Sequence, residues 1–286
     1  MRKIKYFLQF IIIFFLFFIF KLIGQKFSTN LSGQILSFIG PLFRSKVILK
    51  NNISLVFPKM DEKSKKEIIK KMWINYGKIL AEYIYIKKFR IDKIQENFEI
   101  EGQEVLENIK ENKKPVVFIS GHFNNFELMA MHLEKSGINL TAVYRPLNNF
   151  FLNRFMEKIR KKYICEKQIK KGISGTKNLL RNFKNGSSIA LMIDQRVSEG
   201  IKSKFFGKDA LTTTIPAQFF LKFKCEIVPV YIERKKNDKF KLTIYNPISF
   251  SKDDDEKSIT LYLNQILEKM ILKNPDQWIW SHNRWK

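Results

Sequence analysis

Residues 115–128 read PVVFISGHFNNFEL, and this segment carries the strongest fold signal in the sequence. Its apolar, β-branched beginning over residues 116–119 is typical of a buried strand. Gly121 permits a sharp exit from that strand, and Asn124 or Asn125 is expected to cap the helix that follows. A buried strand that runs into a helix favours an α/β fold, in which ligands bind beyond the carboxyl ends of the strands.

Two ionisable residues, His122 and Glu127, lie where the predicted strand meets the predicted helix. A histidine serves as a general base near neutral pH when a carboxylate holds its ring in one tautomer. An offset of five residues does not align two side chains on a regular helix. We therefore expect His122 in the turn and Glu127 in the first helical turns, reaching back to the ring. From these residues alone, a structural histidine is the alternative, and the spacing differs from the HExxH pattern of zinc sites.

The N-terminal residues predict a membrane anchor. Basic residues precede an apolar stretch over residues 6–20, interrupted only by Gln9, which is near the lower length for a transmembrane helix. Residues 22–26 offer no convincing small-residue cleavage site, so we expect an uncleaved, single-pass anchor over residues 1–24. A cleaved secretory signal is the alternative. Basic residues flank the stretch on both sides, so charge alone does not set its orientation.

The composition of the 286 residues suits one large α/β domain, expected over residues 25–286. The net charge of +25, from 52 Lys and Arg against 27 Asp and Glu, favours anionic partners such as nucleic acid, an anionic membrane or phosphorylated substrates. The abundance of Lys, Ile, Asn and Phe is also typical of an AT-rich genome, which would account for part of the charge. Cys165 and Cys225 lie far apart and form no metal or redox spacing, which fits free thiols in a reducing compartment.

Other segments alternate between helical and strand patterns around the central stretch. Helices are expected over residues 27–57, 62–90, 103–110, 150–163, 172–185 and 252–273, and strands over 98–102, 138–144, 188–193, 227–233 and 239–245. This order predicts a central, mostly parallel sheet flanked by helices.

Polar residues follow two of these strands. Arg145 comes directly after residues 138–144, where a guanidinium can grip a phosphate in bidentate fashion, although a solvated surface arginine is the alternative. Asp194 and Gln195 follow residues 188–193. His132 and His282 are expected to be structural.

Several motifs carry a resemblance to a known family. The GHFNNFE block at residues 121–127 resembles motif I, H-x-x-x-x-D/E, of the lysophospholipid acyltransferase superfamily. It is more similar to the bacterial late acyltransferases of lipid A biosynthesis, the lauroyl/myristoyl transferase type. The similar blocks extend over residues 11–286 and include YRP at 144–146, DQ at 194–195, FFG at 205–207 and the closing WSHNRWK at 280–286.

The resemblance implies a glycerol-3-phosphate acyltransferase-like fold and transfer of an acyl chain from an acyl carrier protein thioester. The implied acceptor is a hydroxyl of a lipid A precursor, an acylated and phosphorylated glucosamine disaccharide. In this interpretation His122 is the general base, Glu127 orients it, and the hydroxyl attacks the thioester directly. No metal and no organic cofactor are implied.

The resemblance also implies substrate contacts and a location. Arg145 and Arg160 would hold acceptor phosphate, and the substrate-binding set is completed by Asp194, Gln195 and Asn124. Because the acyl carrier protein is cytoplasmic, the catalytic domain is expected on the cytoplasmic side of the inner membrane, with no nucleic acid as partner.

Two alternatives stay open at this point. A glycerolipid or glycolipid acyltransferase of the same superfamily is the nearer one, although no EGTR block follows the second motif. A non-enzymatic basic protein that binds membranes or nucleic acid would account for the charge and the anchor. It would not account for His122, Glu127 and Arg145 at successive strand ends, and no recognised nucleic-acid-binding module is present.

Overall fold

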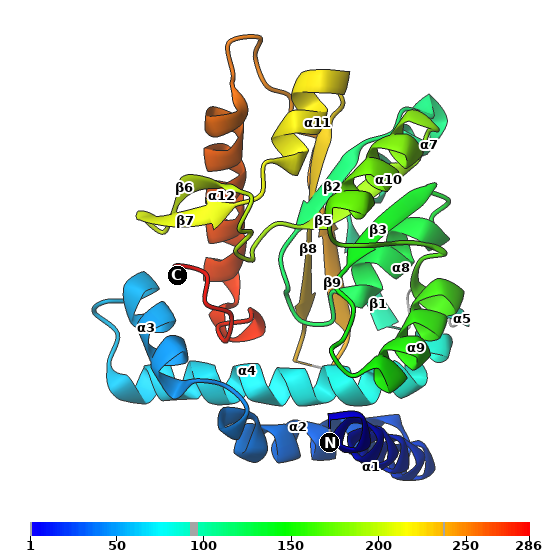
Figure 1. The fold of residues 1–286 in the computed structure, drawn as a ribbon, viewed down its shortest axis with the longest axis vertical. Coiled ribbons are helices and arrows are strands. Elements are labelled where there is room, and N and C mark those ends of the chain that lie inside the picture. Colours follow the sequence, from blue (N-terminus) through cyan, green and yellow to red (C-terminus); the bar gives the residue numbers. More distant parts are fainter. Residues whose placement is uncertain (1, 92–96, 237) are drawn as a thin grey trace.

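A seven-stranded sheet forms the centre of the computed structural model, which describes residues 2–91, 97–236 and 238–286 (Figure 1). Its strands are β1 (Phe98–Glu101), β2 (Val117–Ser120), β3 (Leu140–Tyr144), β4 (Lys167–Lys170), β5 (Ser188–Met192), β8 (Ile227–Arg234) and β9 (Phe240–Ile244). They lie in the order β1-β9-β8-β2-β5-β3-β4. Only the β8–β9 pair is antiparallel among the described strands of this sheet. The prediction of a mostly parallel sheet is therefore confirmed.

The strand predicted over residues 116–119 is β2, and it lies in the middle of the sheet. All four of its residues are buried, and it pairs in parallel with β5 on one side and β8 on the other. Such two-sided burial explains why its sequence is apolar throughout rather than alternating.

Helices flank the sheet as predicted. They are α7 (Gln103–Asn112), α8 (Glu127–Lys135), α9 (Phe150–Ile159), α10 (Ile173–Lys184), α11 (Ile215–Phe223) and α12 (Glu256–Lys273). Helix α8 contacts β3 and β8, α10 contacts β3, β4 and β5, and α11 contacts β2. The sheet and its helices thus share one continuous apolar core.

The N-terminal helices lie along the lower edge of the molecule in Figure 1 and at its two sides. They are α1 (Arg2–Ile23), α2 (Gln25–Ile39), η1 (Gly40–Leu42), α3 (Lys46–Val56), α4 (Glu62–Glu82), η2 (Tyr83–Tyr85) and α5 (Ile86–Ile91). Among the described helices, α1 alone is long and apolar enough to cross a membrane. The helix expected over residues 27–57 is interrupted at η1, which contains Pro41.

Three features of the chain were not predicted. Strand β4 is one, and the antiparallel hairpin of β6 (Ile201–Phe205) and β7 (Lys208–Thr212) is another. The helix expected over residues 150–163 instead changes at its end, where α9 passes into a π-helical turn, η3 (Arg160–Ile164). That turn carries Arg160, one of the predicted site residues.

Candidate active site

Three neighbouring strands bring predicted site residues to one edge of the sheet. Strands β2, β5 and β3 are adjacent and parallel, so their carboxyl ends lie together. His122 comes two residues after β2, Asp194 two residues after β5, and Arg145 directly after β3. This is the edge where ligands bind in open α/β sheets.

His122 and Asp194 form a bonded pair at this edge. The His122 Nδ1 atom lies 2.8 Å from Asp194 Oδ1, and the His122 backbone N–H donates to Asp194 Oδ2 at 2.9 Å. The indole N–H of Trp278 donates to the same Oδ2 at 2.8 Å. Burial by itself would raise the pKa of Asp194, but the charge of His122 and these hydrogen bonds lower it to about 2. The carboxylate is therefore ionised across the physiological pH range.

The pair leaves one nitrogen of His122 available. An ionised Asp194 accepts a hydrogen bond from Nδ1–H, which leaves Nε2 as the basic nitrogen of the neutral ring. The side chain of His122 is 21% exposed, whereas that of Asp194 is fully buried. The ring thus reaches the surface with its orienting carboxylate behind it, and the ring of Phe126 packs against its side with centroids 4.8 Å apart.

Gly121 lets the loop after β2 lie close to Phe123 and Asp194. A Cβ atom at this position would lie 2.9 Å from the Phe123 ring and 3.3 Å from Asp194 Cβ. Contacts below about 3.0 Å essentially do not occur for real Cβ atoms. The absence of a side chain lets the loop after β2 lie directly against Asp194.

Glu127 lies in the first turn of α8 as expected, but it does not contact the His122 ring. The Glu127 carboxylate accepts hydrogen bonds from Tyr83 Oη, from Arg160 Nε at 2.8 Å and from Arg160 Nη2 at 2.5 Å. The expected contact between Glu127 and the His122 ring is absent in this structure, because Asp194 holds the ring nitrogen and Arg160 holds Glu127. Burial, and next the charge of Glu127, raise the pKa of Tyr83 well above its ordinary value, so its hydroxyl stays a donor.

Arg160, which was predicted to hold acceptor phosphate, pairs with Glu127 in this structure. Its side chain is 11% exposed, and Nε and Nη2 both bond to Glu127. Although burial opposes it, the Glu127 carboxylate raises the pKa of Arg160. Nη1 is buried and has no hydrogen-bond partner in the described part of the chain. In this structure Arg160 therefore neutralises Glu127 rather than presenting its charge to a phosphate.

Asn124 and Asn125 do not cap the helix. The N-cap of α8 is Phe126, which makes no side-chain cap hydrogen bond. Asn124 has a left-handed backbone with φ of 41° and is 2% exposed. Its amide donates to Gln277 Oε1 at 2.8 Å and accepts from Arg234 Nη2 at 3.2 Å. The side chain of Asn124, which was predicted to bind substrate, is buried in this structure and bonds to Gln277 and Arg234 from distant parts of the chain.

Residues at and just after the end of α4 contact the loop that carries His122. Glu82 accepts a hydrogen bond from Asn125 at 2.9 Å and pairs with Arg234 Nη1 at 2.7 Å. The next residue, Tyr83, bonds to Glu127. Two successive residues, the last of α4 and the first of η2, thus hold both sides of the turn that carries His122.

Arg145 and Gln195 remain open to a ligand. Arg145 is exposed and Gln195 is half-buried. Neither makes a hydrogen bond or ion pair with the part of the chain that the structure describes.

The other predicted histidines have structural contacts. Burial lowers the pKa of His132 to about 4, and its Nε2 lies 3.2 Å from Gln103 Oε1. His282 accepts a hydrogen bond at Nε2 from the backbone N–H of Arg196, and burial lowers its pKa. Within the described residues, no group of three or more His, Cys, Asp or Glu is arranged to hold a metal ion. Burial raises the pKa of both thiols, Cys165 and Cys225, to about 12.

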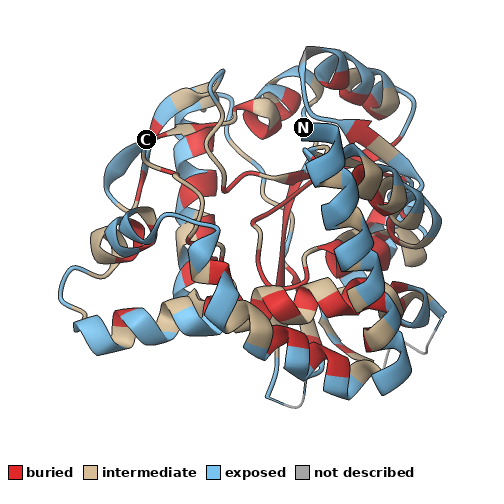
Figure 2. Cartoon of the chain, turned by 60° about the horizontal axis from the view of Figure 1, so that its bottom comes forward, coloured by how far each residue is buried: buried red, intermediate tan, exposed pale blue. Residues whose placement is uncertain are grey.

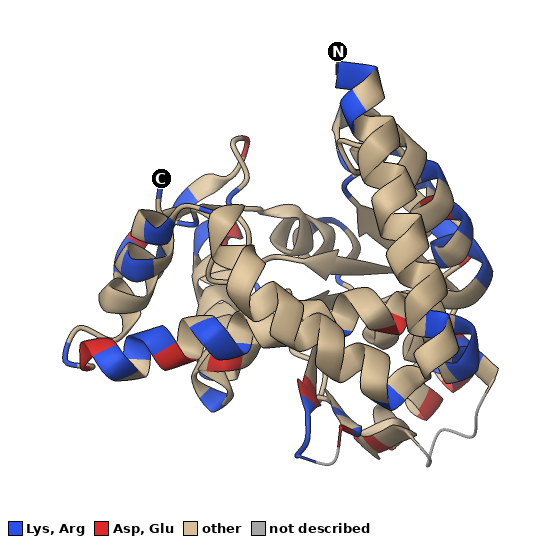
Figure 3. Ribbon diagram, turned by 90° about the horizontal axis from the view of Figure 1, so that it is seen from below, with Lys and Arg blue, Asp and Glu red and all other residues tan. Residues whose placement is uncertain are grey.

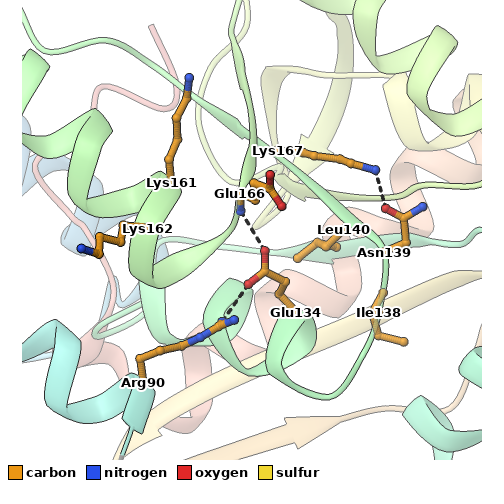
Figure 4. Close-up of a pocket in the computed structure, with 9 residues that line it drawn as sticks. All are labelled: Arg90, Glu134, Ile138, Asn139, Leu140, Lys161, Lys162, Glu166 and Lys167. Carbon is orange, nitrogen blue, oxygen red and sulfur yellow. Dashed lines mark hydrogen bonds and ion pairs between the residues drawn. The ribbon is translucent and has the colours of Figure 1, made fainter.

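A pocket of about 590 Å³ lies at the opposite edge of the sheet (Figure 4). It is lined by Arg90, Glu134, Ile138, Asn139, Leu140, Lys161, Lys162, Glu166 and Lys167. Leu140 and Lys167 are the first residues of β3 and β4, so the pocket is at the amino ends of these strands. It is therefore separate from the His122 site.

The fold and the site are those of an α/β protein with a histidine–carboxylate pair at the carboxyl edge of a mostly parallel sheet. The family model described as bacterial lipid A biosynthesis acyltransferase matches residues 1–286. The chain therefore belongs to this family and is an acyltransferase, which confirms the resemblance and excludes the non-enzymatic alternative.

Characterised relatives agree with this assignment. The chain is 27% identical over 249 residues to a lipid A biosynthesis acyltransferase of Haemophilus influenzae, covering 85% of this chain and 78% of the relative. It is 22% identical to the lipid A biosynthesis lauroyltransferase of Escherichia coli, covering 85% and 79% of the two chains. It is 23% identical to the lipid A biosynthesis palmitoleoyltransferase of the same organism, covering 86% and 80%.

Proposed function

We propose that this enzyme transfers a fatty acyl chain from an acyl carrier protein thioester to a hydroxyl of a lipid A precursor. The acceptor would be an acylated, phosphorylated glucosamine disaccharide. Family membership supports the acceptor class. The observation that carries the chemistry is the His122–Asp194 pair, whose buried carboxylate leaves Nε2 basic and accessible.

The proposed reaction is a direct acyl transfer. His122 Nε2 takes the proton of the acceptor hydroxyl as the oxygen attacks the thioester carbon, and Asp194 stabilises the imidazolium that forms. The tetrahedral intermediate collapses with cleavage of the C–S bond, and the imidazolium returns its proton to the leaving thiolate. One ester forms, one thioester breaks, and no acyl-enzyme is needed.

The oxyanion of the intermediate needs hydrogen-bond donors. The amide groups of residues 122–125 already donate to Asp194, Gly121, Gln277 and Asn124. We therefore assign this role to the next amide groups, those of Phe126 and Glu127 at the start of α8, where the helix dipole adds positive potential.

Glu127 and Arg160 have a positioning role in this proposal. Their buried ion pair, with Tyr83, fixes the first turn of α8 immediately after the His122 loop. Arg145 supplies an exposed guanidinium for an acceptor phosphate, and Gln195 offers an amide at the same edge.

The side of the membrane follows from the donor. An acyl carrier protein is soluble, acidic and cytoplasmic, so the catalytic domain is placed on the cytoplasmic side of the inner membrane, with α1 as an anchor. The net charge of +25 suits both the anionic leaflet and an acidic carrier.

Mass spectrometry of the lipid A fraction tests the acceptor. Cells that lack the protein should contain lipid A with one secondary acyl chain fewer, and the wild-type gene but not a His122→Ala gene should restore it. Unchanged lipid A together with altered glycerophospholipids would contradict the proposal and favour the glycerolipid alternative.

A further inference from the structure

Large apolar side chains are exposed on the N-terminal layer of the molecule. Residues of this kind on α1, α2 and the segment after them include Leu8, Phe15, Phe18, Phe27, Phe38 and Leu42. Figure 2 shows long exposed stretches on these helices, and Figure 3 shows that α1 and α2 are uncharged between their ends. We call the exposed side of residues 4–43 the apolar N-terminal face. Its extent exceeds what scattered surface residues would produce.

Helix α1 is docked on the catalytic domain along most of its length. Four of its phenylalanines contact two of α9: Phe7 and Phe10 lie against Phe151, and Phe14 and Phe17 lie against Phe155. The ring centroids of these pairs are 5.4 to 6.2 Å apart. The contacts run over about three helical turns, so α1 packs against α9 rather than standing apart from it.

Polar contacts fix both ends of α1 to the same domain. Asn149, at the start of α9, donates to the backbone carbonyl of Tyr6 at 2.8 Å. Tyr85 in η2 donates through its hydroxyl to the backbone carbonyl of Phe20 at 2.6 Å. A helix that crosses a bilayer away from its domain would make neither contact.

This docking conflicts with a membrane crossing. If α1 stood across the bilayer, α9 would be carried into the hydrocarbon beside it. The exposed side chains of Arg154 and Lys158 on α9 would then lose their hydration, at high cost. If α1 instead lies flat in the interface, these cations sit at headgroup level, where basic residues are favourable.

The arrangement of α2 supports a flat orientation. In Figure 3 α1 and α2 form a V across one face of the molecule, joined at Gly24, whose φ is 80°. Both helices thus present exposed apolar side chains from the same layer. Lys21, Lys26, Arg44 and Lys46 are exposed near the ends of these helices, and no acidic residue occurs before Asp61. An apolar surface with a purely basic border is complementary to an anionic leaflet.

We propose that the apolar N-terminal face binds one leaflet of an anionic membrane, and that α1 lies within this leaflet without crossing the bilayer. Both ends of α1 then remain on the side of the catalytic domain. This orientation replaces the single-pass anchor expected from the sequence. It rests on the proposed function only in placing the enzyme at a membrane.

Cysteine labelling of the full chain tests the orientation without an activity readout. In a Cys225→Ser background that keeps the buried Cys165, single cysteines are introduced as Lys3→Cys, Lys26→Cys and, on α12, Leu261→Cys. Inverted and right-side-out inner-membrane vesicles are treated with a membrane-impermeant maleimide. We expect Lys3→Cys and Lys26→Cys, near the two ends of α1, to react in the same vesicles as Leu261→Cys. Reaction of Lys3→Cys and Leu261→Cys in opposite vesicles would overturn the proposal. The vesicle type in which Leu261→Cys reacts reports the side of the catalytic domain separately.

A second experiment tests the contribution of α2. A Phe27→Asp and Phe38→Asp double variant removes two exposed apolar side chains from the face and leaves α1 unchanged. Its retention on phosphatidylethanolamine–phosphatidylglycerol vesicles should fall roughly tenfold or more. Leu261→Asp, away from the N-terminal layer, serves as the control with unchanged retention. Full retention of the double variant would show that α1 alone holds the protein, as a crossing helix would.

Discussion

Asp194 is the residue whose contacts differ most from those that the sequence predicted. Its carboxylate is fully buried, accepts three hydrogen bonds and contacts His122 through both oxygens. A buried carboxylate in this position fixes the ring and the tautomer at once, which is the function that the sequence assigned to Glu127. In this structure Asp194 contacts His122, whereas Glu127 pairs with Arg160 at the start of α8.

Asp194→Asn is expected to lower kcat by roughly 10²–10⁴-fold, because the amide places a donor against Nδ1 or leaves the ring without a charge partner. Glu127→Gln is expected to cost less, since it keeps an acceptor for Arg160. Steady-state kinetics of the two variants measure which carboxylate contributes more to kcat. A kcat that survives Asp194→Asn and collapses in Glu127→Gln would return the orienting role to Glu127.

Arg145 is expected to act in binding. Arg145→Ala should raise KM for the phosphorylated acceptor more than it lowers kcat, because the exposed guanidinium contacts no described residue whose position the reaction needs. Lys is expected to substitute poorly, since it lacks the planar fork. Arg181→Ala, an exposed arginine on α10, is the matched control. A constant KM with a collapsed kcat would place Arg145 at the reacting atoms or in the fold instead.

At the scale of elements, the sequence predicted the central strand, the flanking helices and the sheet class. The sequence patterns are strong there, because β2 is buried on both faces and is apolar throughout, whereas the helices are buried on one face and are amphipathic. It could not predict the His122–Asp194 contact, because that contact depends on β5 lying beside β2, and strand order leaves no local signal. Glu82, Arg234, Gln277 and Trp278 were missed for the same reason: they reach the loop from distant parts of the chain.

The crossing of α2 and α4 depends on Gly77. A Cβ there would lie 2.2 Å from the backbone oxygen of Ser32, so Gly77→Ala must push the helices apart. We expect it to lower the free energy of unfolding by about 1–3 kcal/mol, measured by urea denaturation. Gly33→Ala is the control, since its nearest contact is 3.1 Å and alanine favours the helix. Equal effects of the two substitutions would show that the helices do not pack this closely.

His132 on α8 makes stability depend on pH. Burial lowers its pKa from 6.5 to about 4, so the unfolded chain binds a proton more readily. The contribution of the neutral ring is fully present above about pH 6.5 and is lost as the pH falls towards 4. We expect roughly 2 kcal/mol to be lost between about pH 7.5 and about pH 5. His132→Gln should remove that part of the pH dependence in urea denaturation, and an unchanged slope would contradict the assignment.

In the whole molecule, we propose that two surfaces act together. The carboxyl edge of the sheet carries the His122–Asp194 pair and an exposed Arg145, while the N-terminal layer presents an apolar face with a basic border. The proposed function needs both, because the acceptor would stay in the leaflet while the carrier-bound donor would arrive from solution. The charge of +25 then has a physical use in addition to any bias of composition.

We propose that His122, held by Asp194, performs acyl transfer to a lipid A precursor. The most direct measurement is mass spectrometry of the product formed by purified full-length enzyme from acyl carrier protein thioester and the acylated, phosphorylated glucosamine disaccharide. The wild-type enzyme is predicted to add one acyl chain, and His122→Ala to be slower by roughly 10²–10⁴-fold with its fold intact by circular dichroism. Full activity of the His122→Ala enzyme, or no acylated product from the wild type, would contradict the account.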